Sequence, residues 1–339
     1  MGQSLAVKYR PHAFEDVCGQ ESIIKILNMQ ASTKRVSNAY LFCGASGCGK
    51  TTIARIFASK INDGKGTPIE IDAASHNGVE AVKTLVKGAS ERSLDSEYKV
   101  IILDECHSIT NQGWQAFLKG IEEPSEYTIF IFCTTDPQKI PPTIINRVQR
   151  FNFQRISNDK IIKRLSYICE EEGFTNYNDT IEFISRLSEG GMRDAISKLE
   201  KVASYDTNLS IDNALRALGA YSYDKLFEMV NNMIDGKEKE ALSLIEDYYN
   251  DGGDVKVFVD QLLEFVLDLG KYSMFQDYHT TKIPSFYEDK MRFCTGFKEN
   301  VEYFAWLVDK VLSIKNALRY DTSPKTTLEI MVMNICRMK

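Results

Sequence analysis

Apolar and amphipathic segments alternate along the first half of the chain. Short apolar runs, which are typical of buried strands, lie at 39–43, 69–72, 99–103, 127–133 and 148–153. Between them the apolar residues recur at helical spacing, which predicts helices over 20–32, 51–60, 79–91, 112–121 and 141–147. Apolar strands that alternate with helices predict an α/β domain, in which helices cover both faces of a parallel sheet.

The strand pattern ends near residue 157. Amphipathic helical stretches follow at 161–173, 180–189, 193–203 and 212–218, and longer helical stretches continue from 220 onward. Glycines or prolines interrupt the longer stretches near 236, 252, 284 and 324. The sequence therefore predicts an α/β core over 1–157, a small helical domain over 158–219 and an all-helical C-terminal domain over 220–339.

The composition is that of an ordinary globular protein. Of the 339 residues, 43% are hydrophobic and 26% are charged, which excludes a wholly disordered or fibrous chain. No apolar run approaches the roughly 18 residues of a membrane span, and the N-terminal segment lacks an apolar signal core. The eight cysteines form no C-x-x-C pair, which predicts a reducing compartment without disulfides or zinc. We therefore expect a soluble, cytoplasmic protein without a membrane partner.

Charge is distributed unevenly along the chain. The formal net charge is −6, which argues against a protein that coats nucleic acid, because such binding depends on Lys and Arg. Residues 1–157 nevertheless carry 18 Lys and Arg against 16 Asp and Glu, whereas the remainder carries 23 against 31. Any contact with nucleic acid is therefore expected in the first half.

A phosphate-binding pattern of the form G-x-x-x-x-G-K-[ST] lies between a predicted strand and a predicted helix. Its residues are Gly44, Ala45, Ser46, Gly47, Cys48, Gly49, Lys50 and Thr51, and Thr52 follows directly. Backbone N–H groups in such a loop turn toward phosphate oxygens, and the positive end of the helix dipole reinforces them. We expect Lys50 to reach the β- and γ-phosphates of ATP and the Thr51 hydroxyl to hold Mg²⁺. A chance glycine-rich turn is the alternative, which the strand–loop–helix context disfavours.

Two carboxylates follow the apolar strand at 99–103. Asp104 is suited to complete the Mg²⁺ coordination, and Glu105 to polarise the attacking water. A solvated strand end is the alternative. Together with Cys106 and His107, these residues also spell the D-E-x-H of a helicase. Helicases of that class need two tandem α/β domains, whereas the predicted strands stop near 153, and His107 receives no role.

Further segments form an ordered set along the chain. They are Tyr9-Arg10-Pro11 with Phe14, Asp16-Val17 and Gly19-Gln20, then IDAAS at 71–75, LKGIEEP at 118–124, TTDPQKIP at 134–141 and GGMRDA at 190–195. In these motifs and their order the chain resembles the AAA+ clamp-loader ATPases, and the DNA polymerase III gamma/tau family in particular. The detailed resemblance covers residues 5–205, and beyond it only helical character and length agree.

The resemblance implies a fold and a function. It implies an AAA+ ATPase core over 1–157, a helical lid over 158–219 and a helical collar over 220–339. Family members assemble through their collars as homo- or hetero-pentamers, and they use ATP to open a ring-shaped sliding clamp and place it on primer–template DNA. The expected partners are therefore the clamp, other loader subunits and DNA, in a bacterial cytoplasm or, for a phage homologue, in its host.

The resemblance also implies roles for single residues in the nucleotide site. Thr135 matches the γ-phosphate sensor, and Arg193 matches the second sensor on the lid. Arg147 matches a finger that enters a neighbouring subunit's site, although Asn146 and Val148 replace the usual flanking Ser and Cys. The alternatives are a strand-end threonine, a helix-surface arginine paired with an acidic neighbour, and a structural surface arginine.

Two further groups of residues follow from the same resemblance. We call the segment from Tyr9 to Gln20 the N-terminal box. It is expected to line the adenine pocket with Arg10, Pro11 and Val17, unless it merely packs against the core edge. Contacts to DNA phosphates are expected without base readout. The matching positions are His76, Asn77, Lys83, Lys119 and Thr143. For Lys83 and Lys119 a solvated helix face is the alternative.

The chain departs from the family in two places. Residues 60–67 join a helix to the next strand directly, where relatives usually carry a four-cysteine zinc module, so zinc is not expected. The chain also ends where the collar should end, as expected for a short form, a divergent phage homologue or a truncated chain. Two other functions stay open: a scaffold subunit whose nucleotide only supports structure, and another AAA+ DNA motor such as a branch-migration ATPase.

Overall fold

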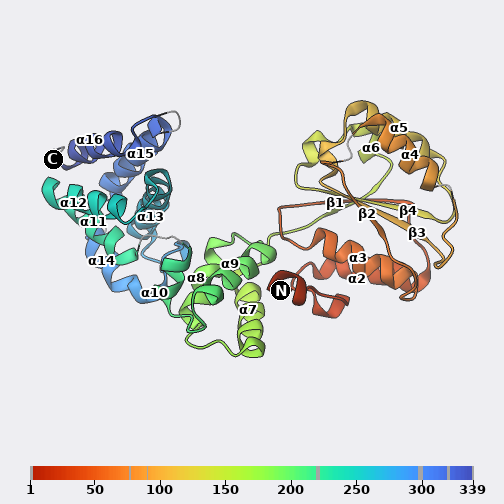
Figure 1. Ribbon diagram of the computed structural model, residues 1–339, viewed down its shortest axis with the longest axis horizontal. Helices are drawn as coiled ribbons and strands as arrows, with labels where there is room; N and C mark the ends of the chain where they lie inside the picture. Colours follow the sequence, from red (N-terminus) through yellow and green to blue (C-terminus); the bar gives the residue numbers. More distant parts are fainter. Residues whose placement is uncertain are drawn as a thin grey trace. The chain divides into compact units, whose positions relative to one another are not determined.

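The computed structural model describes residues 3–75, 78–89, 91–218, 222–296, 301–318 and 321–337. The chain divides into two compact units (Figure 1). Unit 1 comprises Met1–Ile168 and Ser188–Ser197, and unit 2 comprises Cys169–Leu187 and Lys198–Lys339. The division into three domains at 157 and 219 stays a prediction.

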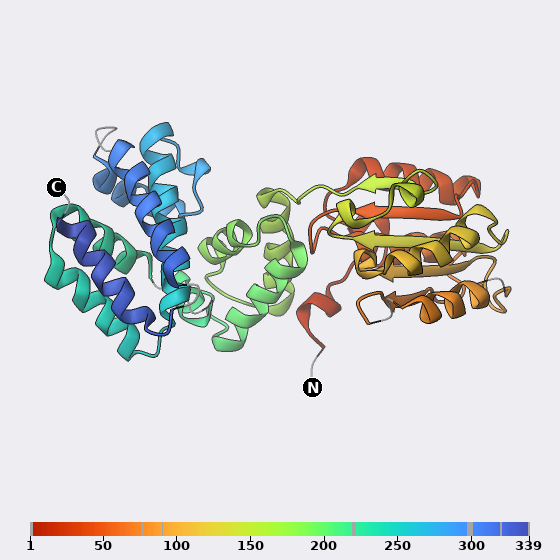
Figure 2. The same cartoon turned by 90° about the horizontal axis from the view of Figure 1, so that it is seen from above.

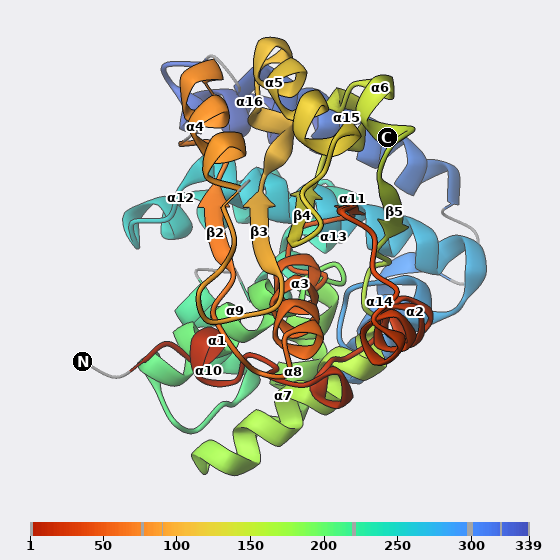
Figure 3. The same cartoon turned by 90° about the vertical axis from the view of Figure 1, so that its right-hand side faces the viewer.

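Unit 1 is built on a five-stranded parallel sheet with the strand order β2-β3-β4-β1-β5. The strands lie side by side in Figures 2 and 3. Their bounds are β1 Ala39–Cys43, β2 Ile69–Asp72, β3 Lys99–Asp104, β4 Thr128–Thr134 and β5 Gln149–Asn152. The predicted parallel sheet is confirmed, and each strand end lies within one residue of its predicted position.

Helices cover both faces of this sheet (Figure 1). One face packs against α2 (Glu21–Thr33) and α3 (Lys50–Ile61), and the other against α4 (Val79–Ala89) and α5 (Asn111–Glu122). Alternate residues of β1 serve the two layers: Tyr40 and Phe42 join the first core, and Leu41 joins the second. Because every residue of β1 and β4 is buried, apolar and polar residues do not alternate along them, and the polar residues of β4 are the threonines at its two ends.

Short helical segments complete unit 1. They are α1 (Leu5–Lys8), α6 (Pro142–Ile145) and the 3₁₀ turns η1 (Phe14–Asp16), η2 (Cys106–Ser108) and η3 (Pro137–Lys139). The boundary between the units falls within α7 (Asn158–Glu172) and within α9 (Met192–Tyr205).

Unit 2 is helical in its described residues, apart from an isolated bridge between Thr175 and Asn208 and two 3₁₀ turns, η4 (Tyr278–Thr280) and η5 (Ser285–Tyr287). Its other helices are α8 (Asn178–Leu187), α10 (Ile211–Leu218), α11 (Tyr223–Asp235), α12 (Glu238–Asn250), α13 (Val255–Phe275), α14 (Glu288–Thr295), α15 (Val301–Leu318) and α16 (Pro324–Arg337). The predicted helices and their breaks are confirmed. No helix among the described residues combines the length and apolarity that crossing a bilayer requires.

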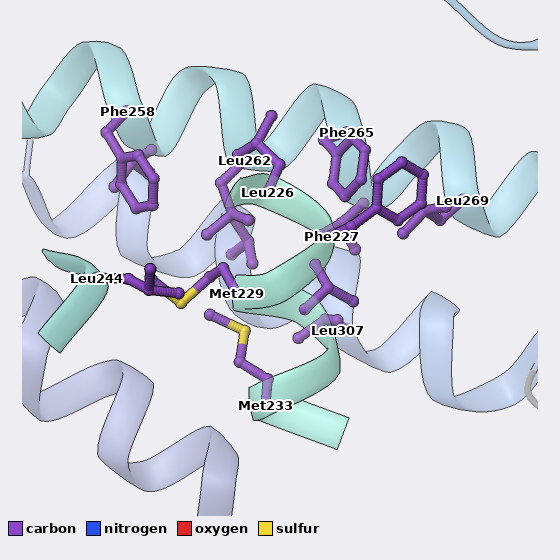
Figure 4. Packing of buried hydrophobic residues seen from close by; sticks show 14 of the residues in the cluster. Leu226, Phe227, Met229, Met233, Leu244, Phe258, Leu262, Phe265, Leu269 and Leu307 are labelled. Carbon is purple, nitrogen blue, oxygen red and sulfur yellow. The ribbon is translucent and has the colours of Figure 1, made fainter. Parts of the chain in front are cut away.

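The core of unit 2 joins α11, α12, α13 and α15. Leu226, Met229 and Met233 of α11 meet Leu262 of α13 and Leu307 of α15, as Figure 4 shows. All five side chains are buried, so the amphipathic pattern of each helix is explained by its packing against the others.

Candidate nucleotide-binding site

The phosphate loop leaves the sheet at the end of β1, between β4 and β5. The N–H of Gly44 donates to Thr134 O (3.1 Å), and the N–H of Phe153 donates to Cys43 O (2.7 Å). A Cβ atom on Gly44 would lie 2.7 Å from Phe153 O, so this close approach requires glycine. In this strand order the connection after β1 runs toward β2 at one edge of the sheet, whereas the connection after β4 runs toward β5 at the other edge. Open α/β sheets bind ligands at such a point, beyond the carboxyl ends of the strands.

Lys50 is the first residue of α3, and its side chain curls back over the loop. Its Nζ donates to Gly44 O and to Ala45 O, both at 2.9 Å, and the residue is 6% exposed. The cation is therefore already held where phosphate oxygens would replace the loop carbonyls as acceptors. Burial raises the pKa of the Cys48 thiol, which therefore adds no negative charge to the loop.

The predicted magnesium ligands lie next to each other. Thr51 Oγ1 donates to Asp104 Oδ2 at 2.8 Å, and Asp104 Oδ1 accepts from the N–H of Glu105 at 3.0 Å. A hydroxyl and a carboxylate at one edge of the phosphate loop form the oxygen donor set that Mg²⁺ prefers when it also binds phosphates. The residues present therefore fit the ion.

Glu105 and Thr135 meet although 30 residues separate them. Thr135 follows β4, and its Oγ1 donates to Glu105 Oε2 at 3.0 Å. Glu105 adopts a left-handed backbone with φ of 47°. A non-glycine residue in that conformation is strained, and such strain concentrates at functional sites.

One pocket in unit 1 gathers most of the predicted residues. Its lining includes residues 46–52 of the loop and helix, Asp104, Glu105, Arg10, Pro11, Val17 and Arg193. Gly44, Ala45, Thr135 and Arg147 are not among its lining residues. The N-terminal box and the Gly-Gly-Met-Arg turn thus border the same space as the phosphate loop.

The pocket is lined by four cationic side chains, those of Arg10, Lys50, Arg164 and Arg193, and by three carboxylates, those of Asp16, Asp104 and Glu105. Burial and then the nearby Arg55 guanidinium lower the pKa of Arg10, and Arg193 adds to this effect, whereas Glu70 opposes it. Arg55 is itself paired with Glu70 at 2.5 Å. Cations this close repel one another, so an anion in the pocket would relieve their repulsion.

The turn before α9 lies directly against the phosphate loop. The N–H of Met192 donates to Gly47 O at 3.0 Å, and a Cβ atom on Gly47 would lie 3.2 Å from the Cα of Gly191. Gly190 O accepts from the N–H of Ile156 at 3.1 Å. These backbone contacts bring Arg193 to the pocket.

Arg147 lies outside the pocket of its own chain. Its Nη2 is 2.8 Å from Glu122 Oε1, and its Nη1 donates to Thr143 O at 2.8 Å. The side chain is 42% exposed, so its guanidinium is accessible to another molecule.

The predicted DNA-contacting residues are scattered over helix surfaces. Lys83 pairs with Glu80 of the same helix at 2.9 Å, and Lys119 and Thr143 are exposed. His76 and Asn77 lie outside the described residues. Lys83, Lys119 and Thr143 lie outside the lining of the nucleotide pocket.

Gln20 contributes to the site in a way that sequence reasoning missed. Its buried side chain donates from Nε2 to Cys48 O (3.3 Å) and to Gln154 O (2.7 Å), and its Oε1 accepts from the N–H of Gln154 (3.1 Å). It thereby ties the phosphate loop to the segment after β5. The Gly19-Gln20 motif marked the residue, but no local pattern reveals a partner 134 residues away.

Arg164 and Met192 also line the pocket without having been predicted. Arg164 Nη2 donates to Tyr9 O at 2.7 Å, which fastens the N-terminal box to α7. Met192 precedes Arg193 in the GGMRDA segment, and that segment was the signal that could have identified it.

The fold and the site define a P-loop nucleotide-binding protein of the AAA+ class. Among solved structures, the Thermotoga maritima RuvB Holliday junction branch migration motor matches with a TM-score of 0.53 and 18% identity, over 67% of this chain and 80% of that one. At this identity the likeness concerns the fold alone.

Sequence comparison finds more specific similarities. The model of "DNA polymerase III, delta subunit" matches residues 67–157, and that of "DNA polymerase III subunits gamma and tau domain III" matches residues 209–338. The DNA polymerase III subunit tau of Bacillus subtilis is 32% identical over 99% of this chain and 63% of its own length. The gamma/tau subunit of Mycoplasma genitalium is 33% identical over 80% of this chain and 50% of its own length. The chain is thus similar to DNA polymerase III gamma/tau subunits over most of its own length, and it spans less than two thirds of the length of these relatives.

We predict that Gly190→Ala destabilises unit 1 more than Gly64→Ala does. Both glycines have positive φ, so alanine costs about 1–2 kcal/mol at either position. At Gly190 the new Cβ would also lie 2.6 Å from Arg155 Cβ, whereas open space surrounds Gly64, and overpacking adds about 1–3 kcal/mol. Urea unfolding followed by Trp114 fluorescence in a Trp306→Phe background measures the difference. Equal losses of stability would contradict the packing described for the turn.

Proposed function

We propose that the chain is an ATP-driven motor subunit of a DNA-replication clamp loader. In this proposal ATP binding and hydrolysis open a ring-shaped sliding clamp and place it on primer–template DNA. Similarity to gamma/tau subunits over most of the chain supports the proposal. The observation that carries it is the convergence of Lys50, Thr51, Asp104, Glu105 and Arg193 on one pocket.

Each of these residues has a role in the proposed hydrolysis. Lys50 binds the β- and γ-phosphates, and Glu105 orients the attacking water and accepts its proton. Thr135 senses the γ-phosphate through its hydroxyl, which donates to Glu105 Oε2 at 3.0 Å. Arg193 contacts the γ-phosphate from the turn that Gly47 O holds, so the position of α9 responds to the nucleotide.

Thr51 and Asp104 would hold Mg²⁺. When bound, the ion neutralises charge on the β- and γ-phosphates. The 2.8 Å contact between Thr51 Oγ1 and Asp104 Oδ2 keeps both oxygen ligands together before the ion arrives.

Assembly completes the site in this proposal. Arg147 is exposed and outside its own pocket, which suits a finger that enters a neighbouring subunit. Pentameric assembly through the helical C-terminal region, contact with the clamp and with DNA phosphates, and residence in the cytoplasm all remain part of the proposal. The proposed DNA contacts are those of His76, Asn77, Lys83, Lys119 and Thr143.

The two alternative functions are less well supported. A scaffold subunit has no need of Lys50, Asp104 and Glu105 in one pocket. A branch-migration motor is favoured only by a fold likeness at 18% identity, whereas residues 209–338 match the gamma and tau domain III.

We predict that Lys50→Ala weakens ATP binding by about 10- to 100-fold, because hydrogen bonds to charged groups contribute about 1.5–3 kcal/mol. Titration calorimetry with MgATP measures the change. Lys25→Ala, which removes an exposed lysine of α2, serves as the charge-matched control and keeps the parent affinity. Unchanged affinity in Lys50→Ala would refute the proposed phosphate contact.

We predict that Arg147→Ala leaves ATP affinity within about twofold of the parent value but lowers ATP turnover in the assembly with clamp and primed DNA. Fingers of this kind contribute about 10³- to 10⁵-fold in rate. Steady-state phosphate release, measured with and without clamp and DNA, tests both the variant and the parent. Arg150→Ala removes an exposed arginine of β5 and is the control.

Two outcomes would count against the proposal. Full stimulated turnover in Arg147→Ala would exclude the finger. A parent rate that does not respond to clamp and DNA would favour the scaffold function.

A further inference from the structure

His107 occupies a position beside the proposed catalytic carboxylate. It lies in η2, immediately after the left-handed Glu105, and its side chain is 20% exposed. Its Nδ1 is 3.3 Å from Glu105 Oε2 and 3.2 Å from Thr134 Oγ1. His107 is the histidine of the D-E-x-H motif found in helicases. The described residues form one α/β sheet and not the two domains of such a helicase, so that motif assigns His107 no role here.

The contacts of the Glu105 carboxylate fall on one of its two oxygens. Oε2 accepts from Thr135 Oγ1 at 3.0 Å on one side and faces His107 Nδ1 at 3.3 Å on the other. Within the described part of the chain, these contacts leave Oε1 as the oxygen that can take a water molecule. The carboxylate thus contacts one residue that follows β3 and one that follows β4.

Thr134 fixes the imidazole in turn. Its side chain is fully buried, and Oγ1 accepts from the N–H of Asp136 at 3.0 Å. An Nδ1 lone pair aimed at the Glu105 carboxylate would be repelled, so we assign the ring proton to Nδ1. Nδ1–H then donates to Thr134 Oγ1 at 3.2 Å and also faces Glu105 Oε2 at ion-pair distance, 3.3 Å, where its positive end attracts the carboxylate.

We propose that His107 is a positioning residue that orients the Glu105 carboxylate for its work on the attacking water. This inference rests on the proposed ATPase function and deepens it. His107 does not line the nucleotide pocket, whereas Glu105 does. Its loss therefore acts on the rate of ATP cleavage and not on nucleotide binding.

The test compares His107→Ala with His107→Asn in the full chain assembled with clamp and primed DNA. We expect His107→Ala to lower the single-turnover rate of ATP cleavage by about 10- to 100-fold, the typical effect of a misplaced catalytic group. MgATP affinity stays within about twofold of the parent value. His107→Asn, whose amide N–H can replace Nδ1–H, restores most of the rate. His279→Ala, a change in unit 2, leaves the rate at the parent value.

A second comparison separates positioning from a merely structural role. In a Glu105→Gln background, His107→Ala should not lower the residual rate further, because no carboxylate is left to orient. An unchanged rate in His107→Ala, a parallel loss of affinity, a failure of His107→Asn to restore the rate, or an additional loss in the Glu105→Gln background would each overturn the inference. A parent assembly that does not cleave ATP would instead overturn the proposed function, and this inference with it.

Discussion

The hydrogen bond from the N–H of Met192 to Gly47 O, at 3.0 Å, is the contact on which the arrangement of the site depends. It fastens the start of α9 to a loop that β1, β4 and β5 already hold. Because Gly47 and Gly191 lack side chains, the two backbones approach closely enough for this bond to form. Arg193 thereby reaches the pocket that Lys50 and Asp104 border, so segments far apart in the sequence line one pocket.

Much of the fold could be predicted because its physical causes are local. Runs such as 39–43 and 128–134 are buried on both faces of a parallel sheet, so they read as apolar strands without alternation. The phosphate loop could be predicted for the same reason: its glycines, Lys50 and Thr51 are contiguous. Asp104 could be predicted because it ends an apolar strand. In the structure its Oδ2 lies 2.8 Å from Thr51 Oγ1.

Other parts of the site depend on contacts between distant segments and have no local pattern. Gln20 bridges Cys48 and Gln154, and His107 meets Thr134 only after β3 and β4 pair. The 30-residue separation between Glu105 and Thr135 likewise closes only in the folded sheet. The role of Arg147 lies one step further away, because the proposed acceptor of its charge belongs to another molecule.

The central claim is that each nucleotide site is completed by the neighbouring subunit's Arg147. Mixing Lys50→Ala chains with Arg147→Ala chains tests this claim most directly, with ATP turnover measured in the assembly. Either variant alone lacks one part of every site, whereas a mixed assembly contains interfaces at which an intact phosphate loop faces an intact finger. The account predicts that turnover reappears on mixing and rises with the fraction of mixed interfaces. Turnover that stays at the level of the separate variants, in assemblies shown to be mixed, would contradict it.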